Sequence, residues 1–183
     1  MMNTGKSTST GETKNTVKSA DDAIRMLTDD HKKVKALFKQ IEKAKKDEDQ
    51  DLKVELAQQV CNELTVHASI EEEIFYPAVR DAIEDDDLMN EALVEHASAK
   101  DLIAQLSEMD DQDPMFDAKL QVLSEYIDHH VKEEETEMFV KAKKAKLDFE
   151  ELGEEMMTRK SELMGALGMS DEPAKPVKRA AKK

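Results

Sequence analysis

The chain has 183 residues and a net charge of -15, with 38% charged and 4% aromatic residues. This length allows one domain with a hydrophobic core. The acidic balance argues against nucleic acid or an anionic membrane as a specific partner, because phosphate recognition needs clustered Lys and Arg. Few aromatic, Gly and Pro residues, with abundant Glu, Lys, Ala and Leu, favour an all-α fold.

No apolar run approaches the roughly 20 residues that a membrane span requires. The first residues also lack the apolar segment of a secretory signal, so we expect a cytoplasmic protein. The single cysteine, Cys61, excludes an internal disulfide framework. We expect it to be a small buried hydrophobic residue, with a redox-sensing thiol as the alternative. The sequence leaves the oligomeric state open.

Both ends of the chain are polar, and we expect neither to pack. Residues 1–18 are mostly Ser, Thr, Gly, Lys and Asn, so they offer too little apolar surface to offset the entropy of ordering. Residues 168–183 contain five Lys or Arg against two acidic residues. The sequence therefore predicts a disordered leader and a basic disordered tail.

Four long periodic segments predict an up-down-up-down four-helix bundle over residues 19–147. The expected helices cover about 19–46, 51–83, 87–109 and 114–146. Ser19 is the expected N-cap of the first helix, Pro77 should kink or break the second, and Pro114 suits the first turn of the fourth. The linkers are short and acidic, which suits antiparallel neighbours. A short fifth helix over 148–167 should pack across the outside or one end.

One face of each long helix is apolar except at a histidine and, in three of the four helices, at one further charged residue. Positions that repeat at intervals of three and four share a helix face. In chain order these faces are Ile24, Leu27, His31, Val34, Phe38 and Ile41; Leu56, Val60, Leu64, His67, Glu71, Ile74 and Ala78; Met89, Leu93, His96, Lys100 and Ile103; and Phe116, Leu120, Leu123, Ile127, His130, Glu134 and Met138. Each helix thus places one His inward, and the second and fourth add a Glu one turn later.

Adjacent histidines and runs of glutamate surround these inward positions. Because successive helical residues point about 100° apart, His130 faces inward and His129 turns away, although His129 is the alternative ligand. The other glutamates of the two runs are expected to form a solvated face, unless one orients a ligand His or replaces a carboxylate ligand: Glu72, Glu73, Glu133 and Glu135. We expect Tyr76, Phe75 and Phe139 to pack in the core beside these groups.

Ionisable groups inside an apolar core need compensation. A carboxylate buried alone costs several kcal/mol or becomes protonated. Inward His and Glu from facing helices of a four-helix bundle build di-iron or di-manganese carboxylate sites. Imidazole nitrogen and carboxylate oxygen suit iron or manganese and, less distinctively, zinc. The repeated His-x3-Glu pairs, with one lone inward His on each remaining helix, therefore predict a metal site at His31, His67, Glu71, His96, His130 and Glu134.

Four segments, DDHKKVKALF, HASIEEEIFYP, EHASAKDLI and HHVKEEETEMF, resemble the hemerythrin-like family of HHE cation-binding domains. The resemblance covers about residues 20–145. It implies a four-helix bundle with two iron ions, rather than manganese or zinc, bridged by two carboxylates and an oxo or hydroxo species. The six residues of the predicted site match the ligand positions of the family.

One position departs from the oxygen-carrying members of that family. They have a second His one turn after the first in the third helix, where this chain has Lys100. An ammonium group cannot bind a metal, so Lys100 would have to be neutral or turn outward, and reversible oxygen carriage is disfavoured.

Three functions remain open on the sequence. The first is a di-iron protein that interacts with O2, H2O2 or NO in sensing, storage or detoxification. The second is a catalase-like or peroxidase-like di-iron enzyme, with Glu72 relaying protons. The third is a metal-free helical adaptor.

Overall fold

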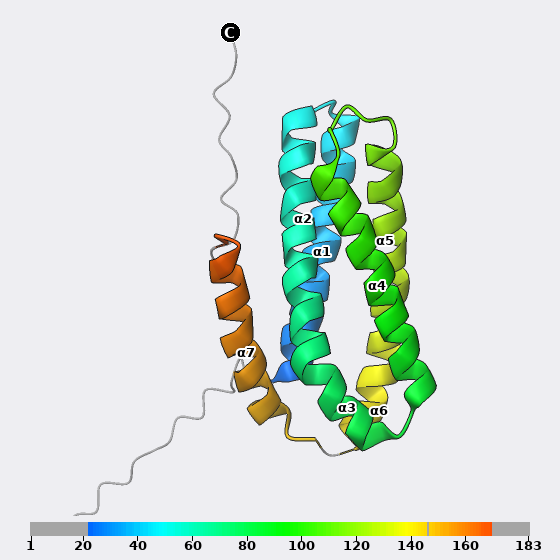
Figure 1. Cartoon of the computed structure of the whole chain (residues 1–183), viewed down its shortest axis with the longest axis vertical. Coiled ribbons are helices and arrows are strands. Elements are labelled where there is room, and N and C mark those ends of the chain that lie inside the picture. The colour runs from blue at the N-terminus through cyan, green and yellow to red at the C-terminus, as the bar shows by residue number, and fades with distance from the viewer. Residues whose placement is uncertain (1–21, 146, 170–183) are drawn as a thin grey trace, which may run out of the picture.

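The computed structural model describes residues 22–145 and 147–169, and every regular element in these ranges is helical (Figure 1). In chain order the elements are α1 (Ala23–Lys46), α2 (Gln50–Ile70), the π-helical turn η1 (Glu71–Phe75), α3 (Tyr76–Ile83), α4 (Asp86–Glu108), α5 (Phe116–Glu133), the π-helical turn η2 (Glu134–Met138), α6 (Phe139–Lys144) and α7 (Phe149–Ala166). The predicted all-α class is confirmed. The predicted leader (1–18) and residues 170–183 of the predicted tail lie outside the described residues, and the division into domains stays a prediction.

Four helical rods form the bundle, because η1 joins α2 to α3 and η2 joins α5 to α6. The first rod, α1, contacts α2 and α5, while α4 contacts α5 and α2. Successive rods run in opposite directions, as the up-down-up-down prediction requires (Figure 1). The fifth helix, α7, packs along the outside of the bundle against α1, α2 and η1.

The second rod departs from α-helical geometry before Pro77 rather than at it. The turn η1 is π-helical, and the Tyr76 N–H donates to the carbonyl oxygen of Glu71. Pro77 follows in the first turn of α3, where its missing N–H costs little. The fourth rod has the same π-helical turn at η2, although Val140 stands where the second rod has Pro77. The π turn therefore accompanies the repeated His-x3-Glu-Glu segment, and such turns are frequent at functional sites.

Two helix starts differ from the prediction. The first helix begins at Ala23, because the Asp22 carboxylate accepts a hydrogen bond of 3.0 Å from the Ile24 N–H and so acts as the N-cap. The expected cap, Ser19, lies outside the described residues. The fourth rod begins at Phe116, two residues after Pro114, which lies in the preceding turn.

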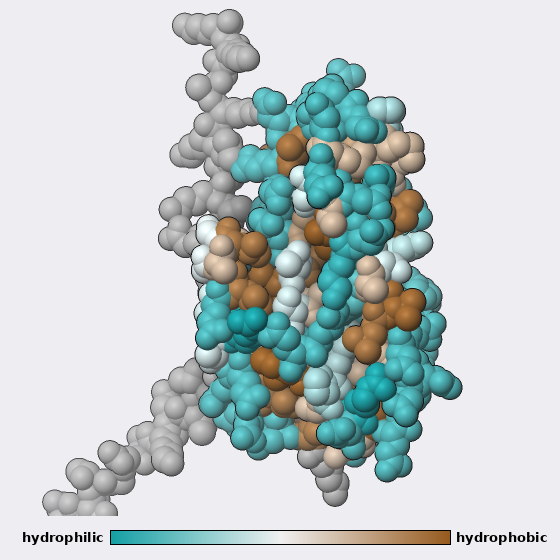
Figure 2. Space-filling model, viewed as in Figure 1, coloured by the Kyte–Doolittle hydropathy of each residue, from teal (hydrophilic) through white to brown (hydrophobic). Residues whose placement is uncertain are grey.

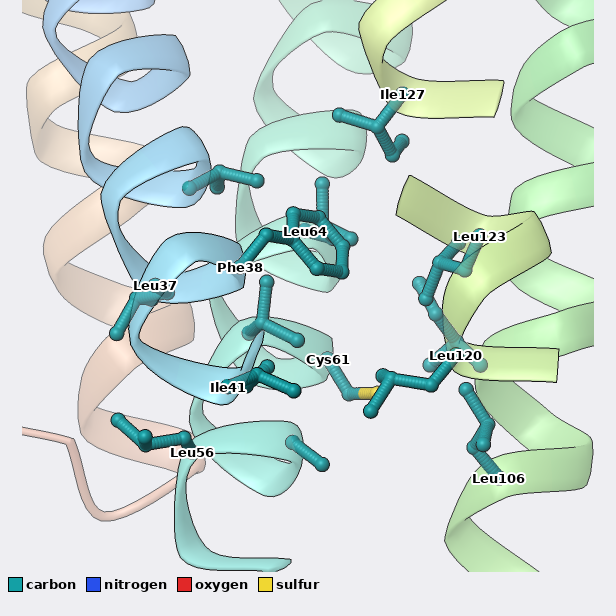
Figure 3. Packing of buried hydrophobic residues seen from close by; sticks show 14 of the residues in the cluster. Leu37, Phe38, Ile41, Leu56, Cys61, Leu64, Leu106, Leu120, Leu123 and Ile127 are labelled. Atoms are coloured by element: carbon teal, nitrogen blue, oxygen red, sulfur yellow. The ribbon is translucent and has the colours of Figure 1, made fainter. Parts of the chain in front are cut away.

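Two apolar clusters fill the bundle, one on each side of a polar layer. The first joins the C-terminal half of α1 to the N-terminal half of α2 and to α4 and α5 (Figure 3). Cys61 belongs to this cluster, and burial raises the pKa of its thiol to about 11, which fits the expected hydrophobic role. The second cluster lies around the π turns and contains Leu27, Ile70, Phe75, Met89, Met138 and Met156. The inward histidines lie between these two clusters.

The inward face of α4 differs from the prediction at two positions. Leu93 is 38% exposed, and the Lys100 side chain is 49% exposed. Ala92 and Ala99 are buried in their place, on either side of His96. These small side chains leave room for the His96 imidazole where α4 meets its neighbours.

The outer surface is mostly hydrophilic in the view of Figure 2, with an apolar patch over α4, where Leu93 and Val94 are exposed. None of the helices in the described part of the chain has the length and apolar character needed to cross a membrane.

Candidate metal centre

The six predicted ligand residues converge on one buried layer. His31, His67, His96 and His130 project from α1, α2, α4 and α5, while Glu71 and Glu134 each take the first position of a π turn. None of the six is more than 5% exposed. His129, the alternative to His130, is 60% exposed and faces away from this layer.

The donor atoms form two adjoining groups. In the first, His31 Nε2 lies 3.2 Å from His67 Nε2 and 3.2 Å from Glu134 Oε2. His67 Nε2 lies 3.2 Å from Glu71 Oε2. One atom from each of these four residues can be chosen so that all lie within 4.8 Å of one another.

The second group repeats this arrangement on the other side of the two carboxylates. His96 Nε2 lies 3.1 Å from His130 Nε2 and 3.4 Å from Glu71 Oε2, and His130 Nε2 lies 3.6 Å from Glu134 Oε2. Ligand atoms about 2.1 Å from one ion lie about 3.4 Å apart in tetrahedral coordination, and about 3.0 Å apart at right angles. The donor spacing in both groups therefore fits a metal ion, with Glu71 and Glu134 between the two positions.

The other imidazole nitrogens contact four carboxylates that we call the outer carboxylates: Asp30, Glu72, Glu95 and Glu135. Glu135 Oε1 lies 2.9 Å from His31 Nδ1, Glu72 Oε1 lies 2.9 Å from His96 Nδ1, and Glu95 Oε2 lies 2.8 Å from His130 Nδ1. Asp30 Oδ2 lies 3.6 Å from His67 Nδ1, longer than a hydrogen bond. Because a carboxylate only accepts, each Nδ1 in a hydrogen bond carries the proton.

The protonated Nδ1 atoms of His96 and His130 leave the Nε2 lone pairs of these two residues facing each other. Two lone pairs 3.1 Å apart repel unless a proton or a cation lies between them. Three carboxylate oxygens in the same layer also lack a hydrogen bond within the described residues: both oxygens of Glu71, and Oε2 of Glu134. A buried carboxylate without a partner is costly, so this donor set fits a bound metal better than it fits a metal-free core.

In the absence of a cation, the two buried carboxyl groups differ strongly in pKa. Burial and the neighbouring charge of Glu134 raise the pKa of Glu71 well above its usual range. Burial also opposes ionisation of Glu134, but interactions with the nearby imidazoles of His31 and His130 outweigh it and hold the pKa of Glu134 below its usual range. The layer thus tolerates one carboxylate charge by itself and needs added positive charge for the second.

Burial also affects the histidines. It lowers the pKa of His67, and together with the nearby charge of His130 it lowers the pKa of His96 to about 4. Burial opposes protonation of His130 as well, but Glu95 and Glu134 raise its pKa. His67 and His96 are therefore neutral near pH 7, which is the form of imidazole that binds metals.

The outer carboxylates reveal an internal repeat of the whole site. An acid directly precedes each lone His, as in Asp30-His31 and Glu95-His96, and contacts the His of the next helix. A second Glu directly follows each inward Glu and contacts a His of the opposite helix pair, which gives Glu72 to His96 and Glu135 to His31. Such outer contacts orient metal-binding imidazoles and increase their basicity.

Tyr76 and Phe139 take equivalent positions in the two halves but make different contacts. The Tyr76 hydroxyl donates to Glu134 Oε1 at 3.0 Å and lies 3.1 Å from His96 Nε2. The Phe139 ring is parallel to the His31 ring, with their centroids 6.0 Å apart. Tyr76, expected to be only core packing, is thus the one hydroxyl group in the described part of the centre.

Two lysines complete the surroundings of the outer carboxylates. Lys100 turns outward and donates to both oxygens of Glu72, at 2.8 and 2.7 Å. Lys160 of α7 donates to Asp30. The position where oxygen carriers are expected to have a second His therefore stabilises an outer carboxylate instead.

A small apolar cavity adjoins the centre. Its volume is about 20 Å³, which is room for about one water-sized molecule. The four inward histidines form one side of it, and Val34, Leu64, Ile103, Ile127 and Val131 form much of the rest, with Lys100 among the lining residues. A small uncharged molecule can occupy such a space next to the donor atoms.

Sequence reasoning missed two of the outer carboxylates and the hydroxyl group. Asp30 and Glu95 lie off the apolar face, so a search for inward residues passes over them. The signal was present, because both stand immediately before a lone inward His. Glu72 and Glu135 agree with the alternative expectation for the glutamate runs, in which a glutamate orients a ligand histidine.

Replacing an outer carboxylate should weaken metal binding without removing a ligand. We expect Glu72→Gln and Glu135→Gln each to lower the affinity for Fe²⁺ or Zn²⁺ by about 10- to 100-fold, because a neutral amide makes the imidazole less basic. Competition with a chromophoric chelator measures this affinity. The matched control is Glu73→Gln, in the same turn as Glu72 but paired with Arg159 on the surface. An equal loss in the control would mean that net charge, rather than histidine orientation, sets the affinity.

Comparison with known proteins gives three findings. The family model of the hemerythrin HHE cation binding domain matches residues 22–142. A crystal structure of a hemerythrin HHE cation binding domain-containing protein from Mycobacterium kansasii aligns with a TM-score of 0.63 and 27% identity, covering 79% of this chain and 88% of that one.

The third finding is a protein from Nostoc sp. strain PCC 7120 described as a DNA nickase. It is 32% identical over 118 residues, which are 64% of this chain and 32% of the Nostoc protein. This chain therefore spans about a third of the length of that relative.

Proposed function

We propose that this chain, which belongs to the hemerythrin HHE cation-binding domain family, binds two iron ions and interacts with O2, H2O2 or NO in sensing, storage or detoxification. One observation carries the proposal: four imidazole Nε2 atoms and two buried carboxylates converge in a layer where no Lys or Arg of the described residues forms an ion pair with either carboxylate. Iron is proposed over manganese or zinc on the resemblance to this family, and an oxo or hydroxo bridge is part of the same proposal.

The residues divide naturally between two ions. His31 and His67 would hold one and His96 and His130 the other, with Glu71 available to both. Glu134 groups with the first pair, and its Oε2 also lies 3.6 Å from His130 Nε2, so it would reach both ions. Bound iron would supply electrons and exchangeable coordination positions. The Tyr76 hydroxyl donates a hydrogen bond to Glu134, so it fixes the orientation of that carboxylate and holds a proton inside the layer.

The cavity supports a small uncharged partner. Its apolar lining beside the four histidines suits a diatomic gas or peroxide better than a charged or bulky substrate. The ion pair of Lys100 with Glu72 stabilises the group that orients His96 and adds no ligand, which favours sensing, storage or detoxification over reversible carriage.

Two other functions receive less support. DNA nicking is described for the Nostoc protein, of which this chain matches only a third, and a net charge of -15 opposes contact with a phosphate backbone. A metal-free adaptor leaves the opposed lone pairs and the unpartnered Glu71 oxygens unexplained. Disproportionation of peroxide at the same centre is distinguished from non-enzymatic binding by the experiment below.

The test begins with anaerobic loading of metal-free protein with Fe²⁺, followed by metal analysis and absorption spectra on exposure to O2, H2O2 or NO. We expect about two central irons per chain and ligand-dependent charge-transfer bands. His130→Ala should lose iron and bands, while Glu73→Gln should keep both. Oxygen release from peroxide by the iron-loaded wild type that is absent from His130→Ala would assign the enzymatic alternative. Far fewer than two irons per chain would contradict the proposal.

A further inference from the structure

We infer a third, peripheral metal site formed by Glu95, His129 and Glu133, outside the central layer. It would take a divalent transition metal such as Zn²⁺, because one imidazole nitrogen and two carboxylate oxygens are the donors such ions accept. This inference goes beyond the proposed function, because none of the six central ligand residues takes part. Glu95 is one of the outer carboxylates.

The three side chains already have the spacing of metal ligands. His129 and Glu133 lie one turn apart on α5, and His129 Nε2 lies 3.3 Å from Glu133 Oε1. Glu95 reaches across from α4, with its Oε1 3.5 Å from His129 Nε2. These distances bracket the spacing of about 3.4 Å expected for two ligands of one tetrahedral ion. Three protein ligands leave a coordination position for water.

The local charge favours a cation. Of the outer carboxylates, Glu72 is paired with Lys100 and Asp30 with Lys160. In the described part of the chain, neither Glu95 nor Glu133 forms an ion pair with any Lys or Arg, and their shared neighbour is an imidazole. Glu95 and Glu133, which share one imidazole, thus lack the ammonium group that balances Glu72 and Asp30.

The site is open to solvent but connected to the centre. The His129 side chain is 60% exposed, while those of Glu95 and Glu133 are 21% and 29% exposed, so an ion can reach all three. Glu95 uses Oε1 toward His129 and Oε2 toward His130 Nδ1, at 2.8 Å. An ion at the peripheral site would therefore share one carboxylate with the histidine that faces the centre.

The test counts Zn²⁺ bound per chain by titration calorimetry and metal analysis after desalting. We expect three equivalents for the wild type and two for both His129→Ala and Glu133→Gln. The double variant Glu71→Gln/Glu134→Gln, which disables the central layer, should keep one equivalent. Glu108→Gln removes an exposed charge near the C-terminal end of the same α4 and should bind three.

An NMR measurement on the individual histidines distinguishes the peripheral site from the central one. With five His in the chain, each imidazole can be resolved by long-range ¹H–¹⁵N NMR. In the Glu71→Gln/Glu134→Gln background, addition of Zn²⁺ should shift the His129 resonances, and the shift should vanish with Glu133→Gln. Unchanged His129 resonances, or an unchanged stoichiometry in His129→Ala, would overturn the inference. Failure of the central site to bind would instead show as loss of the other two equivalents.

Discussion

Replacing Glu71 by Gln is expected to stabilise the metal-free protein and to abolish tight metal binding, two effects of opposite sign. Glu71 is fully buried, and neither of its oxygens has a hydrogen bond within the described residues. An amide of the same shape cannot ionise, and its N–H groups can donate to the Nε2 atoms of His67 and His96 next to it. We expect a gain of about 1–3 kcal/mol in the free energy of unfolding at pH 7.

This gain should depend on pH in a defined direction. The pKa of Glu71 is raised in the folded protein above its ordinary value of 4.5. Below that ordinary value the carboxyl group is protonated in both states, so the folded state bears no penalty. As pH rises from 4.5 toward the raised pKa, the unfolded chain releases a proton that the folded chain retains, and stability falls. The advantage of Glu71→Gln should therefore be small near pH 4 and should grow as pH rises through this window.

Denaturant unfolding of chelator-treated protein at several pH values measures the first effect, and competition with a chelator measures the second. The loss of metal affinity should exceed the roughly 10- to 100-fold loss expected for an outer carboxylate, because Glu71 contacts both donor groups. Glu73→Gln, in the same π turn, should change neither quantity. Destabilisation of the metal-free protein by Glu71→Gln would show that the protein alone compensates this carboxylate, and the argument for a cation would fail.

Metal loading is expected to produce the largest change in stability. A ligand that binds only the folded state at a thousandfold excess over its Kd adds about 4 kcal/mol, so two such ions add about 8 kcal/mol. For a chain of this length, this corresponds to a rise in Tm of roughly 20 °C. The physical reason is that the six ionisable side chains come together only in the folded bundle. There they repel one another without a metal ion, and a bound ion replaces this repulsion by coordination.

Thermal melting with anaerobic Fe²⁺ and after chelation measures this change. The double variant Glu71→Gln/Glu134→Gln should show at most a small shift, because it retains only the peripheral ligands. Glu108→Gln should behave like the wild type. A Tm that chelation leaves unchanged in the wild type would favour the metal-free adaptor over every metal-dependent function.

The structure explains why such a costly layer is compatible with a stable fold. Val34 and Leu64 pack on one side of it, and Leu27 and Phe75 on the other. These clusters keep water away from the donor atoms, which strengthens each electrostatic contact in the layer. The same exclusion makes an unpaired carboxylate costly, so stability and metal binding become linked.

The sequence by itself determined the fold class, the order of the four rods and the inward direction of the six candidate ligand residues. Helical periodicity assigns a side chain to a face, so the inward directions of His130 and Glu134 follow from their place among Ile127 and Met138. The repeated His-x3-Glu pair predicted a metal site, because two buried carboxylates and four imidazoles in one bundle need a common cation. Membership of the HHE cation-binding family agrees with that reading.

Only the tertiary structure decided how residues off these faces pair across helices. The partner of each Nδ1 depends on the angle and spacing of neighbouring rods, so the roles of Asp30 and Glu95 could not be read from periodicity. The hydroxyl of Tyr76 enters the layer in one half while Phe139 packs in the other, because α3 and α6, which follow the two π turns, begin with different residues. A helix pattern fixes directions around one axis, whereas distances between donor atoms arise only when separate axes pack together.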